Sequence, residues 1–407
     1  MNSKTLLALF LIVTAAPVLA QTPAAPPPAP VAGFQDGFFV QSPDGEYRLV
    51  FGMVAQADAR FTVNDPTPIT NTFTLRKLRP TLTGQLTKYF AFKLMPDFGN
   101  GVTTVPDAYL EFRPSTAFRI RTGKDKTPVG YELLQADAFL WFPERSLATS
   151  LVPNRDLGIA VLGDLAGARV SYQAGVFNGV SDGASSALEV DTNNAKDVAG
   201  RILINPFRAS THTALRGFGF HLGGSTGTQT GALPVFRTSS GQTYFAYDRD
   251  TTAAGGRTRV APAVFYYNKS FGAFGEYTRS AQTVAKNGHA SDIANDAWHV
   301  TASYMLHGDT VSYGAIRPKN NFNPTQHHWG AVQLLARYSA LAVDPLIFES
   351  ALAAPTASQI ARSFTVAMNW FPNPHIKYYA TFEHTAFEGG ATRPAEDLFL
   401  LRAQLNF

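Results

Sequence analysis

The sequence predicts an all-β protein, a transmembrane antiparallel β-barrel of about 16 strands with a constriction loop folded inward. Apolar and polar residues alternate with a period of two from about residue 46 to the last residue, and side chains of a strand point alternately to its two faces. After residue 20 no run reaches the roughly 18 apolar residues that indicate a transmembrane helix. A soluble sheet produces one or two such strands, whereas repetition along a whole chain is typical of a membrane barrel.

The first 35 residues precede this pattern. Residues 1–20 have the features of a signal peptide, with Lys4 in the basic region, an apolar core from Leu6 to Val13 and a small-residue cleavage site. The apolar core is too short for a membrane span of about 20 residues, and a buried helix is the alternative. Residues 21–35 are rich in proline and alanine, so we expect an extended periplasmic leader. Residues 36–407 would then form the barrel.

Composition narrows the possible functions. The chain has no cysteine, so it holds neither disulfides nor a thiolate metal site, and no motif indicates a cofactor. Aromatic residues make up 12% of the chain, which suits the lipid-facing bands and interfacial girdles of a barrel. Without Lys4 there are 33 basic and 30 acidic side chains, an excess too small to indicate nucleic acid as a partner.

The alternation divides the chain into sixteen predicted strands. Their ranges are 46–62, 70–87, 89–99, 103–114, 116–125, 156–165, 167–178, 195–206, 213–224, 255–268, 271–286, 295–306, 328–342, 359–372, 374–387 and 396–407. The last strand ends in Phe407, which resembles the insertion signal of bacterial outer-membrane barrels.

An even number of strands places both ends of the barrel on the periplasmic side. Most short links then fall on that side and the long links fall outside, as in bacterial barrels. The long outer links lie near 126–155, 179–194, 225–254 and 343–358. Residues 307–327 break this rule, because they are long yet lie on the periplasmic side. Either a strand pair is hidden there, or this turn has its own role, such as folding into the lumen.

The lumen of such a barrel is filled with water. Charged side chains therefore belong inside, since a basic residue facing lipid near the midplane costs about 2–4 kcal/mol. The basic residues that alternation assigns to the lumen are Arg60, Lys77, Arg79, Lys93, Arg119, Arg121, Arg201, Arg257, Arg259 and Arg402, and the acidic ones are Asp58, Asp97, Asp107 and Glu111. Rings of Arg and Lys are the device of anion pores, and Arg binds two phosphate oxygens at once. Alternatively, these charges only hydrate the lumen and pair with one another.

The link at 126–155 is too apolar for a loop left in solvent, and loops of this length are usually functional. Folding it into the barrel would bury its aromatic residues against the wall and narrow the pore. Lys124 and Lys126 at its start, and Arg145 and Arg155 toward its end, would then lie near the constriction. A surface loop at a subunit contact is the alternative.

The blocks RKLRPTLTGQLTKYFAFKL, DAYLEFRP, RTGKDKTPVGYE, FPERSL, NRDLG and AGVFNG follow one another in this order. Their order and spacing resemble the phosphate-selective porin O/P family from about Phe38 to Phe407. The resemblance implies a sixteen-stranded trimeric porin that is narrowed by the third external loop and one periplasmic turn. It would account for both 126–155 and 307–327.

The resemblance also implies site residues. By motif position, Arg76 and Lys77 match the paired basic residues of the second strand, Lys124 and Lys126 match the lysine region before the third loop, and Asp97 matches the nearby acid. Lys77 departs from the arginine that family members often have, and only Arg237 and Arg249 are candidates for a fifth-loop contribution. The predicted anion-binding constriction comprises Arg76, Lys77, Arg79, Asp97, Arg119, Arg121, Lys124, Lys126, Arg145, Arg257 and Arg259.

These observations predict an outer-membrane channel for passive diffusion of small anions, namely chloride and above all phosphate or polyphosphate. We expect a homotrimer in outer-membrane lipid, with no catalysis, cofactor, metal or nucleic acid. A general or sugar porin is the first alternative, with Tyr109 and Trp329 as its aromatic candidates. An outer-membrane enzyme is the second, although His289, His299 and His384 lie on separate segments and no motif places a serine and an acid beside them.

Overall fold

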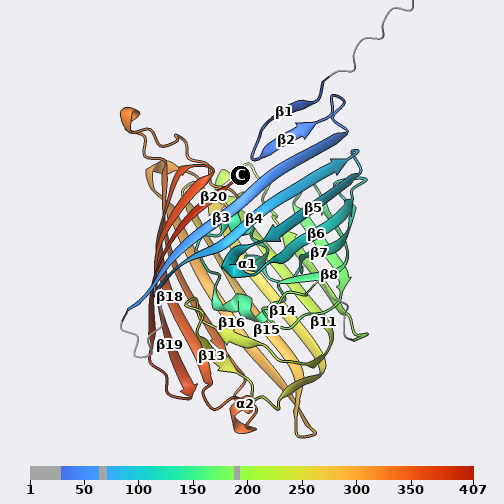
Figure 1. The fold of residues 1–407 in the computed structure, drawn as a ribbon, viewed down its shortest axis with the longest axis vertical. Coiled ribbons are helices and arrows are strands. Elements are labelled where there is room, and N and C mark those ends of the chain that lie inside the picture. Colours follow the sequence, from blue (N-terminus) through green and yellow to red (C-terminus); the bar gives the residue numbers. More distant parts are fainter. Residues whose placement is uncertain (1–28, 64–70, 188–192) are drawn as a thin grey trace, which may run out of the picture.

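A computed structural model describes residues 29–63, 71–187 and 193–407. Within these ranges, sixteen long strands form a closed antiparallel barrel (Figure 1). They are β3 (Tyr47–Val63), β4 (Thr72–Leu86), β5 (Phe90–Asp97), β6 (Thr104–Phe112), β7 (Arg119–Lys126), β8 (Arg155–Leu165), β9 (Val170–Phe177), β10 (Asp197–Ile204), β11 (Phe218–Gly231), β14 (Thr252–Asn268), β15 (Phe271–Lys286), β16 (His289–Met305), β17 (Ala331–Ala342), β18 (Ser358–Asn373), β19 (Ile376–Gly390) and β20 (Glu396–Asn406). All sixteen predicted strands are confirmed, and their ends differ from the predicted ones by at most seven residues.

Each strand pairs with the next, and β20 pairs with β3 to close the barrel. The backbones of Met53 and Phe407 exchange hydrogen bonds of 2.9 and 3.0 Å at the end of this seam. We call the end of the barrel where the chain terminates the terminal rim, and the opposite end the loop rim. The terminal rim is the end of the barrel that was predicted to face the periplasm.

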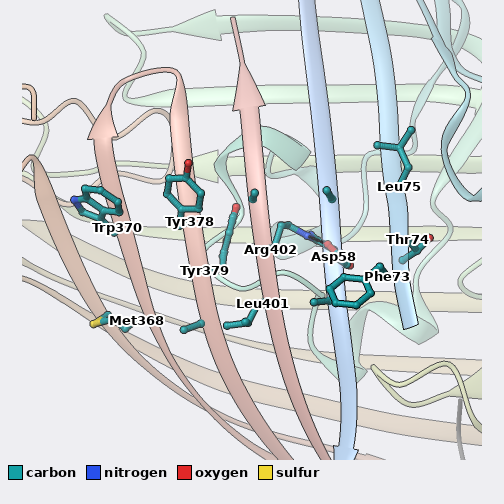
Figure 2. Close-up of a pocket in the computed structure, with 14 residues that line it drawn as sticks. Asp58, Phe73, Thr74, Leu75, Met368, Trp370, Tyr378, Tyr379, Leu401 and Arg402 are labelled. Carbon is teal, nitrogen blue, oxygen red and sulfur yellow. Dashed lines mark hydrogen bonds and ion pairs between the residues drawn. The ribbon is translucent and has the colours of Figure 1, made fainter. Parts of the chain in front are cut away.

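The two faces of the wall differ as the alternation predicts. Figure 2 shows the closing seam, where Asp58 and Arg402 point toward each other and where Phe73, Trp370 and Tyr378 line an apolar groove. The Phe73 side chain is 80% exposed, and Asp58 is 2% exposed. Apolar side chains on the outer face and charged side chains inside are typical of a membrane barrel. The outer face contacts lipid hydrocarbon, whereas the interior contacts water.

A short hairpin precedes the barrel. Strands β1 (Val31–Phe34) and β2 (Phe38–Gln41) pair with each other, and β2 pairs with β3. The ring of Phe38 lies 5.6 Å from that of Phe407. The last residues of the leader expected over 21–35 lie in a strand, because backbone pairing and aromatic contacts with the rim hold them there. The signal peptide predicted at 1–20 and the leader up to residue 28 lie outside the described residues.

Three segments fill part of the barrel interior. Residues 127–154 enter from the loop rim and carry α1 (Tyr131–Leu134), which Figure 1 shows inside the outline of the barrel. From the terminal rim, residues 309–316 reach the interior, and the Tyr313 hydroxyl donates to the backbone oxygen of Tyr131 at 2.7 Å. Farther along the same turn, Phe322 and Trp329 are 39% and 59% exposed. The predicted inward loop is confirmed. The long turn at 307–327 meets this loop inside the barrel and contains no hidden strand pair.

The third segment departs from the prediction. Residues 232–251 were expected in an outer link, yet β12 (Val235–Arg237) and β13 (Thr243–Ala246) form a hairpin packed within the barrel. Phe236 and Phe245 are 1% and 0% exposed and pack with Leu151 of the 127–154 loop. Helix α2 (Leu346–Glu349) joins the same apolar cluster through Ile347. The cluster fills one side of the interior near the loop rim. Cavities remain on the side lined by β4 and β7.

Among the described residues, no helix combines the length and apolar character needed to cross a bilayer.

Candidate functional site: a basic constriction

The loop of residues 127–154, called the inner loop below, brings acidic side chains to the basic side of the barrel wall. Its acid Asp137 starts a single 3₁₀ turn, Asp137–Phe139. The Asp137 carboxylate lies 3.2 Å from Nζ of Lys77 and 2.8 Å from a guanidinium nitrogen of Arg145. It also pairs with Arg79, and a guanidinium nitrogen of Arg155 lies 3.6 Å away. One carboxylate is therefore the shared counter-ion of four cations.

A second acid of the inner loop, Glu144, repeats this arrangement closer to the seam. Its carboxylate lies 2.5 Å from a guanidinium nitrogen of Arg60, 3.0 Å from Arg76 and 3.2 Å from Arg402. Arg402 also pairs with Asp58 across the seam. The inner loop is thus fixed to β3, β4 and β20 by charge.

These cations keep both loop acids ionised. Burial raises the pKa of Asp137. The charges of Lys77, Arg145 and Arg79 lower it by more, so that it lies well below its ordinary value. For Glu144, burial also raises the pKa, and Arg76, with Arg402 and Arg60, brings it well below its ordinary value. An opposite charge within about 4–6 Å favours the charged form of a carboxyl group.

Hydrogen bonds to the backbone hold the inner loop in place. The Glu276 carboxylate on β15 accepts from the backbone N–H groups of Tyr131 and Glu132 at 2.8 and 2.9 Å. These are donors at the start of α1 that the helix itself cannot satisfy. From the opposite wall, Nζ of Lys126 donates to the backbone oxygens of Leu133 and Gln135 at 2.7 and 2.6 Å.

Two cavities lie on either side of this constriction. The loop-side cavity, of about 230 Å³, is lined by one acid, Glu144, and by four basic residues, Arg76, Lys77, Arg145 and Arg237. The terminal-side cavity, of about 370 Å³, is lined by Asp107, Asp125 and Asp137 and by six basic residues, Arg79, Lys93, Arg121, Lys126, Arg155 and Arg201. Basic side chains outnumber acidic ones in both cavities.

The sequence model of the family described as phosphate-selective porin O and P matches residues 51–407. The chain belongs to this family. It is an outer-membrane porin, a channel of the bacterial outer membrane. No curated protein matches the sequence.

Solved outer-membrane proteins share the fold of this porin. The outer membrane channel DcaP of Acinetobacter baumannii superimposes with a TM-score of 0.60 at 12% identity, over 93% of this chain and 100% of that one. An anion-selective porin from Comamonas acidovorans gives 0.57 at 12% identity, over 89% and 100%. OmpT of Vibrio cholerae gives 0.58 at 10% identity, over 89% and 98%. The family favours a channel over an enzyme.

The porin brings five of the predicted site residues together around the inner loop. Arg76, Lys77 and Arg79 follow one another closely on β4, Lys126 ends β7, and Arg145 lies on the loop itself. All five line one of the two cavities. Arg121 lines the terminal-side cavity but pairs with Glu111 at 2.5 Å and lies over the ring of Tyr109.

Asp97 has a different role from the one predicted. Its carboxylate lies 2.6 Å from Nε of Arg79 and accepts from the backbone N–H groups of Leu78 and Gly99. It lines neither cavity. We therefore interpret Asp97 as the residue that orients Arg79, rather than as an acid beside Lys124 and Lys126.

The structure places four other predicted residues away from the constriction. Nζ of Lys124 donates to the backbone oxygen of Ser186, and Arg119 pairs with Asp164 at 2.9 Å. Neither residue lines a cavity. Alternation places Lys124 on the inner face, as predicted. There the backbone of residues 178–187 covers its ammonium group, so it does not face the constriction.

Arg257 and Arg259 fail for a similar reason. Both face the interior, but Arg259 lies 2.6 Å from Asp182, with a fully buried side chain. Arg257 lies 2.9 Å from Asp197, which Arg259 also contacts. Neither guanidinium lines either of the two cavities, since Asp182 of the preceding loop and Asp197 at the start of β10 neutralise the pair.

Sequence reasoning missed the two loop acids, Asp137 and Glu144. A signal for them was present, because an apolar loop expected to enter a basic lumen carried acids within QADAFLWFPER. Buried charges are almost always paired, so acids on such a loop would be expected to meet the wall arginines.

Proposed function

We propose that this porin conducts small anions passively and favours phosphate or polyphosphate. The observation that carries the proposal is the excess of basic side chains in the two cavities on either side of the inner loop. A cleft of one charge sign raises the local concentration of the opposite ion. Small anions such as chloride would therefore enter both cavities, whereas cations would be repelled.

The chemistry of the lining favours oxyanions. The loop-side cavity combines Arg76, Arg145 and Arg237 with the hydroxyl groups of Thr149 and Ser239. Guanidinium groups can bind two oxygens of one phosphate, and hydroxyl groups can supply further donors. Chloride offers no such geometry. The expected preference is for phosphate over chloride, together with release fast enough for transport.

Phosphate titration of the chloride current tests this preference. Single channels in a planar bilayer would carry a chloride current that phosphate reduces in a saturable manner, because a bound phosphate excludes chloride from the constriction. Sulfate at equal ionic strength is the control for anion charge. A chloride current that phosphate leaves unchanged would contradict the preference and would leave a general anion porin. Faster flux of neutral sugars than of anions would support the sugar-porin alternative.

We also propose a homotrimer seated in outer-membrane lipid. Strands β5, β6 and β7 have only eight or nine residues, whereas β14 and β16 have 17. A tilted strand needs about 9–11 residues to span the hydrocarbon. Neighbouring protomers would cover this low part of the wall, and OmpT of Vibrio cholerae has been solved in a trimer form. Native mass spectrometry in detergent would give the trimer mass, and a monomer at all concentrations would contradict the proposal.

A further inference from the structure

Asp137 is a carboxylate whose cationic partners line both basic cavities. Its partners Lys77 and Arg145 line the loop-side cavity, whereas Asp137 itself lines the terminal-side cavity with Arg79 and Arg155. An anion that passes from one cavity to the other therefore crosses the ring of cations that Asp137 now occupies. The Asp137 side chain is 6% exposed.

The cations around Asp137 depend on it unequally. Arg79 also pairs with Asp97, and Arg155 also pairs with Asp107 at 2.7 Å. Among the described residues, Lys77 and Arg145 have no carboxylate within 4 Å other than Asp137. If the Asp137 side chain turned away, these two cations would lose that carboxylate, and Arg145 would keep only its bonds to backbone oxygens of the inner loop. An oxyanion could then take the place of the carboxylate.

The backbone under Asp137 is held while its side chain has room to turn. The Gln404 side chain donates to the backbone oxygen of Ala138 at 2.8 Å, and the Gln135 side chain donates to that of Phe139 at 3.0 Å. The terminal-side cavity next to Asp137 has a volume of about 370 Å³. Rotation of the side chain would therefore move the carboxylate without moving the loop.

From this arrangement we propose that Asp137 is a tethered competitor for the permeating oxyanion. Its carboxylate offsets part of the positive charge of the constriction when the pore is empty and is displaced when phosphate binds Lys77 and Arg145. The inference rests on the proposed function. A tethered competitor has a physical advantage for transport, because Lys77 and Arg145 without the Asp137 charge would hold a divalent anion more tightly, and a conducted ion must also be released. Exchange of one anion for another keeps a negative group beside Lys77 and Arg145 at each step.

Removal of this charge tests the proposal. The variant Asp137→Asn should lower the phosphate concentration that halves the chloride current by at least about tenfold. Asp164→Asn is the matched control, because it removes an equal charge from the Arg119 pair, which lines neither cavity. The control should leave phosphate block unchanged. Phosphate block that is unchanged or weaker in Asp137→Asn would overturn the proposal.

A second variant separates charge from folding. The chain has no cysteine, so Asp137→Cys introduces a single thiol that a sulfonate-bearing methanethiosulfonate makes anionic and an ammonium-bearing one makes cationic. Within one folded channel, the anionic reagent should weaken phosphate block and the cationic reagent should strengthen it. Equal effects of both reagents would overturn the inference while leaving anion selectivity intact. A wild-type channel that does not prefer anions would instead overturn the proposed function, and the inference with it.

Discussion

Arg402 of β20 and Asp58 of β3 form a two-pronged ion pair across the seam that closes the barrel. Nε and one terminal nitrogen of Arg402 lie 2.6 and 2.8 Å from the two carboxylate oxygens of Asp58, and the two side chains are 1% and 0% exposed. The inner loop adds to this pair, because Arg402 also contacts Glu144 and the backbone oxygen of Pro143. The first and last strands and the inner loop are thereby joined at one guanidinium group.

Loss of this ion pair should destabilise the barrel. Asp58→Asn leaves the buried Arg402 short of one carboxylate, and removal of one partner of a buried pair costs about 3–5 kcal/mol. The unfolding midpoint in urea, followed by tryptophan fluorescence in detergent, should fall. Glu388→Gln is the control, because its pair with Arg362 is half exposed and such pairs contribute about 0–1 kcal/mol. Equal midpoints for the two variants would contradict the role of the seam pair.

Two lysines that the sequence analysis places in the constriction should differ in their effect on phosphate block. Lys77 contacts Asp137 at the constriction, whereas Lys124 donates to a backbone oxygen of a covering loop and lines neither cavity. We expect Lys77→Gln to raise the phosphate concentration for half block by about tenfold, a change of about 1.4 kcal/mol in binding. For Lys124→Gln, the phosphate concentration for half block should stay within about twofold of the wild-type value. The opposite order would show that the constriction lies elsewhere.

The stability of the inner loop should depend on pH in acid. The pKa of Glu144 lies well below its ordinary value of 4.5, because the arginines around it outweigh burial. A depressed carboxyl pKa contributes stability that is complete above the unfolded pKa and is lost as pH falls through the folded pKa. Urea midpoints should therefore hold above pH 4.5 and decline below it. Glu144→Gln should make that decline shallower, and an unchanged slope would contradict the assignment.

The anchor of α1 should control current noise. Glu276→Gln replaces a carboxylate oxygen by an amide nitrogen, which cannot accept from both backbone N–H groups of Tyr131 and Glu132. A buried donor left without a partner costs about 1–3 kcal/mol, so the inner loop should visit other positions more often. Single-channel records should show frequent partial closures at neutral pH. Thr278→Ser, on the same strand, is the control and should leave the records quiet.

Strand number and facing could be predicted because each residue of a barrel strand has only two choices, lipid or lumen. Asp58, Arg79 and Arg402 all face inward as alternation predicts. Which inward charges remain open to solvent could not be predicted in this way, because that depends on the loops that cover them. Arg259 is covered by Asp182 and Val180, both distant in sequence.

The same limit applies to the β12–β13 hairpin. Its composition looks like that of a polar outer loop, but its aromatic residues Phe236, Tyr244 and Phe245 lie in a buried apolar cluster. Thr238 also donates to the Glu396 carboxylate of β20. The inner loop was easier to predict, since its apolar run from Phe139 to Phe142 is too continuous for a loop in water. Its acids were missed because ion pairing depends on which wall residues the loop meets.

The reversal potential under a KCl gradient tests the central claim most directly. The purified wild-type porin in a planar bilayer of neutral lipid should give a potential close to the chloride equilibrium value, because basic residues predominate in both cavities. A potential near zero or near the potassium value would contradict the anion channel. It would show that the acids of the inner loop, not the basic side chains of the wall, set the field in the pore.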